Sequence, residues 1–244
     1  MPPVTYDYTD RVILISGATG GVGPAVAQAF SDAGATLALA ARNPEKLERL
    51  AADLAESLGV NRLRVLTRPT DLTDPEAVRA MTADVVGRFA RIDVLLNLVG
   101  SWEPGRLETT TDDRWHKVLS TNLHAVFYAI REAVPHMAPG SAIVTVGSQL
   151  PVEGKGGQLA YAVAKGGVLT LTRSVAKELR ARRIRVNAIL PSNIDTPDNR
   201  RFRPNDDFAA WPSPDEIARV LLFLASPEAR LISGALVPVY GRSW

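Results

Sequence analysis

Residues 11–23 have the sequence RVILISGATGGVG, an apolar run followed directly by a glycine-rich stretch. The run at residues 11–16 is typical of a short buried strand, and a helix is expected at residues 22–33. Three glycines lie where strand, turn and helix meet: Gly17, Gly21 and Gly23. Glycine backbone before a helix N-terminus binds phosphate well, because unpaired N–H groups and the helix dipole face the anion. We therefore expect a phosphate-binding turn, with a purely structural glycine turn as the alternative.

The same alternation of apolar runs and amphipathic stretches continues along the chain. Further strands are expected at residues 36–41, 62–67, 92–98, 141–147, 184–190 and 235–239, and further helices at 44–58, from 74 onward, 112–134, 158–180 and 214–225. Near-continuous hydrophobic strands separated by helices indicate a parallel sheet covered on both faces. We predict one α/β, doubly wound (Rossmann-type) domain over residues 1–244, with about seven parallel strands and helices on both faces.

Composition excludes several classes of site and partner. The chain has no cysteine, and its three histidines form no close ligand pair, so no metal site is expected. The net charge is only +2, and the basic residues are mostly scattered, which disfavours nucleic acid as a partner. No apolar run approaches the roughly 20 residues of a membrane helix, and no signal peptide is visible. We expect a cytoplasmic protein without a membrane partner.

The second predicted strand ends at Arg42. NAD-binding folds usually place a carboxylate at this point to accept from the ribose 2′-hydroxyl, and none lies between Asp32 and Glu45. A guanidinium instead matches the 2′-phosphate of NADP in shape and charge. Arg42 therefore favours NADP over NAD, unless it is simply a solvated residue before a helix.

A tyrosine and a lysine lie one helical turn apart. Tyr161 and Lys165 are predicted to share a helix face, where the ammonium would lower the pKa of the phenol. Ser148 follows the fifth strand and would face the crevice beyond the carboxyl ends of the strands. Serine and tyrosine hydroxyls could there bind one substrate oxygen. The pattern suggests a proton-transfer site.

These motifs resemble those of the short-chain dehydrogenase/reductase family. The family's T-G-x-x-x-G-x-G is matched from Ser16 to Gly23, and its S-x12-Y-x-x-x-K by Ser148, Tyr161 and Lys165. The resemblance adds Asn122 as a fourth catalytic residue that holds a water in the proton relay. It implies cofactor contacts, beside Arg42, at Gly17, Thr19, Gly21, Val22, Gly23, Asp71, Leu72, Asn97, Gly100, Tyr161, Lys165, Pro191, Ile194 and Thr196.

The chain departs from the family pattern at some of these points. Leu98 and Val99 replace residues of its N-N-A-G motif, and Ser192 replaces the glycine of P-G-x-x-x-T. Asp71 could equally be a turn or capping residue. The ending at residues 239–244 lacks the common V-D-G-G.

The resemblance implies an NADP(H)-dependent oxidoreductase that moves a hydride between nicotinamide and a small-molecule carbonyl or secondary alcohol. Tyr161 would be the acid/base, Ser148 would orient the oxygen, and Lys165 would hold the ribose and tune Tyr161. A homotetramer or homodimer is expected. Within the family, a 3-oxoacyl-thioester reductase and a pteridine- or quinone-type reductase stay open. A non-catalytic NADP-sensing regulator and a scaffold or nucleic-acid module are the alternatives of other classes.

The substrate walls are expected at Trp102, Trp115, residues 149–158 and a lid at residues 191–214. The lid carries aromatic and basic side chains: Phe202, Phe208, Trp211, Arg200, Arg201 and Arg203. It could suit an aromatic or anionic substrate, or its aromatics could pack the lid down while its arginines lie in solvent.

Overall fold

One parallel sheet organises the molecule. The structure is a computed structural model that describes residues 5–58 and 64–242. Its strands are β1 (Val12–Ser16), β2 (Thr36–Ala41), β3 (Val65–Pro69), β4 (Val94–Asn97), β5 (Ala142–Val146), β6 (Arg185–Pro191) and β7 (Leu236–Val239). They pair in the order β3-β2-β1-β4-β5-β6-β7, every neighbour parallel. The predicted seven-stranded, doubly wound sheet is confirmed.

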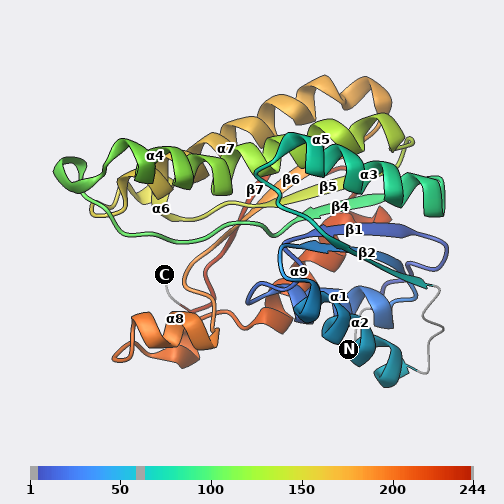
Figure 1. Cartoon of the computed structure of the whole chain (residues 1–244), viewed down its shortest axis with the longest axis horizontal. Helices are drawn as coiled ribbons and strands as arrows, with labels where there is room; N and C mark the ends of the chain where they lie inside the picture. The colour runs from blue at the N-terminus through green and yellow to red at the C-terminus, as the bar shows by residue number, and fades with distance from the viewer. Residues whose placement is uncertain (1–4, 59–63, 243–244) are drawn as a thin grey trace.

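Helices cover both faces of this sheet (Figure 1). The longer ones are α1 (Gly23–Asp32), α2 (Pro44–Leu58), α3 (Pro75–Phe89), α4 (Asp112–Leu119), α5 (Ala125–Ala133), α7 (Leu159–Glu178) and α9 (Pro214–Ala225). Helices α1, α2 and α9 pack on one face, and α3, α5 and α7 on the other. None of the helices in the described ranges is long and apolar enough to span a membrane.

The two-sided cover explains why most strand residues are apolar. In β1, Ile13 and Ile15 belong to the core beneath α1, whereas Leu14 belongs to the core beneath α3 and α5. In β4, Leu96 and Leu95 divide in the same way. Successive side chains of a strand point to opposite faces, and both faces here exclude water. The polar side chains inside the strands, such as Thr145 and Asn187, are hydrogen-bonded to Thr172 and to the carbonyl of Ile232.

Most boundaries agree with the sequence within one or two residues, with three differences. The strand predicted at 62–67 begins at Val65, and residues 62 and 63 lie outside the described ranges. The helix predicted at 112–134 contains a π-helical turn, Ser120–His124, between α4 and α5. The long segment 191–214 is not only loop. It contains α8 (Pro197–Phe202), where Thr196 accepts from the Asn199 N–H and Pro197 starts the first turn.

A short helix α6 (Leu150–Glu153) also follows β5 and was not predicted. It spans a single turn, too short for a hydrophobic period to be visible in the sequence. Its position matters because it lies directly after Ser148.

A buried guanidinium fastens the last helix to the sheet. Arg185, at the start of β6, donates to the carbonyl oxygens of Leu224 (2.6 Å), Ala225 (3.1 Å) and Ser226 (2.9 Å). The last carbonyls of a helix have no partner within the helix, and the negative end of its dipole favours a cation. Arg185 thus satisfies the C-terminal end of α9.

We expect Arg185→Met to lower the free energy of unfolding by at least about 2 kcal/mol, because each buried acceptor left unpaired costs roughly 1–3 kcal/mol. Urea unfolding followed by circular dichroism measures the change. Arg180→Met, an exposed arginine nearby, is the control and should change stability by less than about 0.5 kcal/mol. Equal effects of the two substitutions would contradict this role.

Candidate active site

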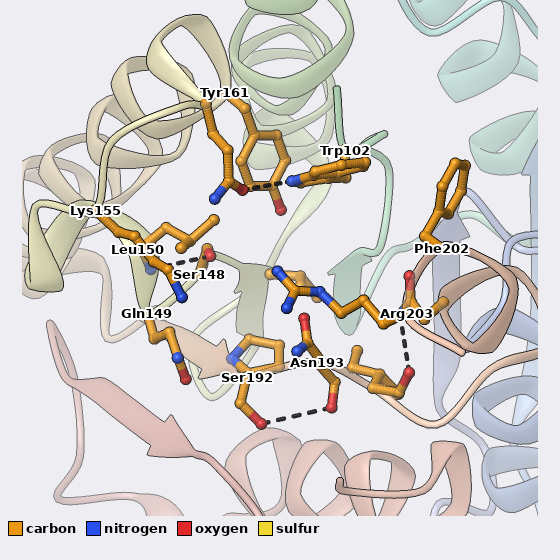
Figure 2. Close-up of a pocket in the computed structure, with 16 residues that line it drawn as sticks. Trp102, Ser148, Gln149, Leu150, Lys155, Tyr161, Ser192, Asn193, Phe202 and Arg203 are labelled. Carbon is orange, nitrogen blue, oxygen red and sulfur yellow. Dashed lines mark hydrogen bonds between the residues drawn. The ribbon is translucent and has the colours of Figure 1, made fainter. Parts of the chain in front are cut away.

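The candidate site lies beyond the carboxyl ends of β1, β4, β5 and β6. The chain leaves β1 and β4 toward opposite halves of the sheet, and such a reversal of strand order opens a ligand crevice. A cavity of about 340 Å³ is present there, lined by Ser148 and Tyr161 among other residues. Figure 2 shows both side chains at this cavity. The structure thus brings together residues from three separate parts of the chain.

The glycine turn packs closely against its neighbours. Gly17 has φ of +80°, and a Cβ added there would lie 2.8 Å from the backbone N of Val99. A Cβ at Gly21 would lie 2.9 Å from Cγ2 of Thr196. Only residues without a side chain permit this approach of the loops after β1, β4 and β6.

The helix after the turn is open to an anion. The N-cap residue of α1, Val22, provides no side-chain hydrogen bond, and the first turn holds no acidic residue. By contrast, α3 and α9 are each capped by a side chain, Asp74 and Ser213. The unsatisfied N–H groups and the dipole of α1 suit a phosphate. This end of the crevice fits the pyrophosphate of a dinucleotide, with Thr19 half-buried beside it.

Arg42 lies at the far end of the same edge. It is exposed directly after β2 and forms no ion pair within the described ranges. Asp71 is exposed after β3, and its carboxylate accepts from the N–H (2.9 Å) and hydroxyl (2.8 Å) of Thr73. These bonds, with a smaller contribution from Arg42, lower the pKa of Asp71. Asp71 is therefore a turn residue, one of the two roles considered; contacts of Asp71 and the buried Leu72 with a cofactor stay predictions.

Tyr161, Lys165 and Ser148 meet as their spacing predicts. Nζ of Lys165 lies 5.9 Å from the centroid of the Tyr161 ring and donates to the carbonyl of Val146 at 2.8 Å. Ser148 is 6% exposed, and its Oγ accepts from the N–H of Leu150 at 3.2 Å. The carbonyl of Val146 fixes the position of the ammonium. No sequence pattern could indicate this backbone partner.

Burial decides the proton affinities of the pair. Tyr161 is half-buried with its ring against the cavity, and desolvation raises its pKa to about 12, although a hydrogen bond with Ser148 acts in the opposite direction. Lys165 is 3% exposed, and desolvation lowers its pKa to about 8. The sequence led us to expect a tyrosine pKa lowered by Lys165, but desolvation raises it and outweighs the hydrogen bond with Ser148. The phenol therefore keeps its proton at neutral pH and can donate it.

Asn122 is the fully buried centre of the π-helical turn. Its Nδ2 donates to the carbonyls of Val118 (3.0 Å) and Ser101 (3.1 Å), and its Oδ1 accepts from the N–H of Ser101 at 3.1 Å. A Cβ at Gly100 would lie 2.8 Å from Oδ1 of Asn122 and 3.0 Å from Nζ of Lys165, so both atoms border one small space. A carbonyl oxygen has two lone pairs, and Oδ1 can accept a second bond there.

Asn97, predicted to contact the cofactor, forms a hydrogen bond within the sheet. Its side chain is fully buried, and Oδ1 accepts from the hydroxyl of Ser16, so it joins β4 to β1. Its Nδ2 has no hydrogen-bond partner within the described ranges. Any contact of Asn97 with a cofactor stays a prediction.

In the segment after β6, some side chains line the cavity and others bind to the rest of the protein. Pro191 and Ile194 line the cavity, whereas the Thr196 side chain is buried and caps α8. The hydroxyl of Ser192, which stands where the family has glycine, donates to the carbonyl of Tyr240 at 2.9 Å. The departure from the family pattern thus ties this segment to the chain after β7.

Some of the aromatic and basic residues of the segment line the cavity, and others pack against the protein. Phe202 and Arg203 line the cavity. Phe208 packs on the buried Trp211, with ring centroids 5.1 Å apart. Of the two predicted tryptophan walls, Trp102 lines the cavity, but Trp115 does not. Trp115 is instead partly buried against the small core cluster between α4 and α7.

Lys165 should make stability depend on pH. Below pH 8 it is protonated in the folded and unfolded chain, and the folded chain bears the cost of burying the charge. Above its ordinary pKa of 10.5 both states are neutral and this cost is absent. Between these values the unfolded chain binds more protons, so the contribution of Lys165 to the free energy of unfolding rises with pH.

We therefore expect the stability of the nucleotide-free wild type, relative to Lys165→Met, to rise by about 3 kcal/mol between pH 8 and 10.5, at roughly 1.4 kcal/mol per pH unit. Urea unfolding at several pH values measures this. Lys177→Met, an exposed lysine of the same helix, should follow the wild type. Parallel curves for wild type and Lys165→Met would show that Lys165 titrates at its ordinary value.

Known proteins are similar to this chain in sequence and architecture. A family model described as enoyl-(acyl carrier protein) reductase matches residues 17–241. A 3-oxoacyl-(acyl-carrier-protein) reductase of Thermotoga maritima is 33% identical, over 95% of this chain and 96% of the relative. A short-chain dehydrogenase/reductase of Brucella melitensis, described as glucose/ribitol dehydrogenase, superposes with a TM-score of 0.91 at 30% identity, covering 98% of each chain.

A third protein was solved with a nucleotide. It is an NADPH-bound short-chain oxidoreductase from Pseudomonas aeruginosa, described as having an atypical catalytic centre. Its TM-score is 0.90 at 28% identity, and the match covers 98% of both chains.

Proposed function

The chain belongs to the short-chain dehydrogenase/reductase family and is an oxidoreductase, and we propose that it uses NADP(H) to interconvert a carbonyl and a secondary alcohol. The observation that carries the proposal is the meeting of Tyr161, Lys165 and Ser148 at one cavity beyond the strand ends. A phenol that holds its proton, next to a buried ammonium and a hydroxyl, is suited to protonate an oxygen that gains negative charge.

The residues that would hold the cofactor fit its chemistry. The glycine turn and the uncapped start of α1 suit the pyrophosphate, and Arg42 suits the 2′-phosphate. Lys165 would hold the ribose. When bound, the nicotinamide supplies or accepts the hydride.

The protein's own groups would move the proton. In the reductive direction, Tyr161 donates its proton to the carbonyl oxygen while Ser148 donates a hydrogen bond to the same oxygen. Lys165 can replace the lost proton, because a group with a pKa of about 8 releases and regains protons near neutral pH. A water between Oδ1 of Asn122 and Nζ of Lys165 would in turn reload Lys165.

The substrate and the assembly belong to the proposal as well. We propose a small-molecule carbonyl or alcohol substrate. A 3-oxoacyl thioester is the second candidate, favoured by the name of the Thermotoga relative. A homotetramer or homodimer is supported by apolar side chains exposed on α5 and α7, Phe127 (41%) and Val163 (44%). The cytoplasm is the proposed location.

Removal of the phenolic hydroxyl is the first test. We expect Tyr161→Phe to lower turnover by at least about a hundredfold, the lower end of the contribution of one acid/base group. NADPH binding, measured by fluorescence, should stay nearly unchanged. Tyr128→Phe, which removes a hydroxyl remote from the cavity, should keep full activity. Normal turnover of Tyr161→Phe would exclude the proposed proton donor.

Reversal of the charge at the end of β2 tests the choice of cofactor. A hydrogen bond to a charged group is worth roughly 1.5–3 kcal/mol, so Arg42→Asp should lower the NADPH/NADH ratio of kcat/KM by about ten- to a hundredfold. Steady-state kinetics with both cofactors measure the ratio. Arg49→Asp makes the same charge change on the exposed side of α2 and should leave the ratio as it is. An unaltered ratio in Arg42→Asp would exclude the phosphate role.

A further inference from the structure

The cavity next to Ser148 and Tyr161 has an unbalanced charge. Two cationic side chains line it, Lys155 and Arg203, and none of its described lining residues is an aspartate or glutamate. Lys155 comes from the loop between α6 and α7, and Arg203 directly follows α8. Figure 2 shows them approaching the cavity from opposite sides, with the guanidinium of Arg203 extending toward the side of Ser148.

Arg203 differs from the other two arginines of its segment. Arg200 makes two hydrogen bonds to the carboxylate of Asp195, at 2.5 and 2.7 Å, and Arg201 pairs with Asp198. Neither lines the cavity. Among the described residues, Arg203 has only Asp206 within ion-pair range, at 3.5 Å, with both side chains more than a third exposed. A pair of this kind is weak, so the guanidinium remains available to a ligand.

Lys155 has no ion pair within the described ranges and is exposed to the cavity. With no carboxylate among the described lining residues, the two cations give the cavity a positive potential. Two cations and no acid in one cavity therefore favour a negatively charged ligand.

The rest of the mouth is aromatic. The rings of Trp102 and Phe202 lie 5.5 Å apart, and the side chains are 39% and 68% exposed. The indole N–H of Trp102 donates to Oε1 of Gln158, which fixes the ring on the side of α7. An apolar part of the ligand could pack against these rings.

We propose that the substrate is an oxo acid, that is, a carbonyl compound that also carries a carboxylate; this rests on the proposed function above. Its carboxylate lies between Arg203 and Lys155, its carbonyl oxygen at Ser148 and Tyr161, and its hydrocarbon part against Trp102 and Phe202. A guanidinium binds a carboxylate through two parallel hydrogen bonds, which fixes orientation as well as position. Arg203 and Lys155 are thus the residues that determine substrate specificity.

The reaction keeps the carboxylate unchanged. The carbonyl carbon receives the hydride, its oxygen receives the proton of Tyr161, and the oxo acid becomes a hydroxy acid while NADPH is oxidised to NADP⁺. The carboxylate serves only to hold the carbonyl in place.

Paired substrates of equal skeleton and different charge test the proposal. Acetoacetate, 4-oxopentanoate and 4-oxocyclohexanecarboxylate are each compared with the methyl ester, and NADPH oxidation is followed. We expect at least one acid to have a kcat/KM about tenfold or more above that of its ester, since a charged hydrogen bond contributes roughly 1.5–3 kcal/mol. Benzoate should compete with the substrate, and the neutral benzamide should not.

Arg203→Gln should lower kcat/KM for the preferred acid about tenfold or more, mainly through KM, and should remove inhibition by benzoate. The ester and NADPH should keep their KM values. Arg201→Gln is the matched control, the same change two residues away on a side chain outside the cavity, and should behave as the wild type. Lys155→Gln should also lower kcat/KM for the preferred acid.

Three results would overturn the proposal. Esters reduced as well as or better than their acids would show that no charge is recognised. An equal loss of kcat/KM for acid and ester in Arg203→Gln would show that the substitution disturbs the structure and not the recognition of the carboxylate. A rise in the KM of NADPH alone would show that Arg203 binds the cofactor and not the substrate. If neither acids nor esters nor any other carbonyl compound supports NADPH oxidation, the proposed function itself fails, an outcome distinct from the other three.

Discussion

The burial of the sheet on both faces determines where a polar site can form in this molecule. Strand interiors such as Ile13–Ile15 and Val94–Leu96 contribute to one core or the other in alternation, so no position along them can carry an unpaired polar group. Chemistry is possible only where the strands end. The reversal of strand order between β1 and β4 separates the loops at this edge and opens the crevice. The candidate site therefore follows from the packing of the core.

Much of the site is formed by backbone. Gly17 and Gly21 allow three loops to approach within contact distance, and the bare start of α1 offers N–H groups in place of a side chain. The π-helical turn around Asn122 and the carbonyl of Val146 place the buried amide and the ammonium. π-Helical turns occur often at functional sites, where they redirect single side chains out of the helical pattern. Here the turn holds Asn122 against the loop that follows β4.

Two environments of opposite character lie next to each other in the crevice. Desolvation raises the pKa of Tyr161 and lowers that of Lys165, so both groups are driven toward their neutral forms. The adjoining cavity is positively charged: Arg203 has only a weak, exposed pair with Asp206, and Lys155 has no ion pair in the part of the chain that the structure describes. The first environment suits proton transfer and the second suits recognition of an anion. An intact Ser148, Tyr161 and Lys165 set also disfavours a non-catalytic NADP-sensing role.

The sequence alone determined the doubly wound sheet, most element boundaries and the residues of the proposed proton-transfer group, because hydrophobic period, capping residues and motif spacing are local properties. It placed Tyr161 and Lys165 together because a helix brings residues four apart onto one face. Only the tertiary structure decided which of three neighbouring arginines faces the cavity, that Trp115 packs between α4 and α7 outside the cavity, and that desolvation raises the pKa of Tyr161. The physical reason is that orientation and desolvation depend on neighbours far away in the chain, and no local pattern records them.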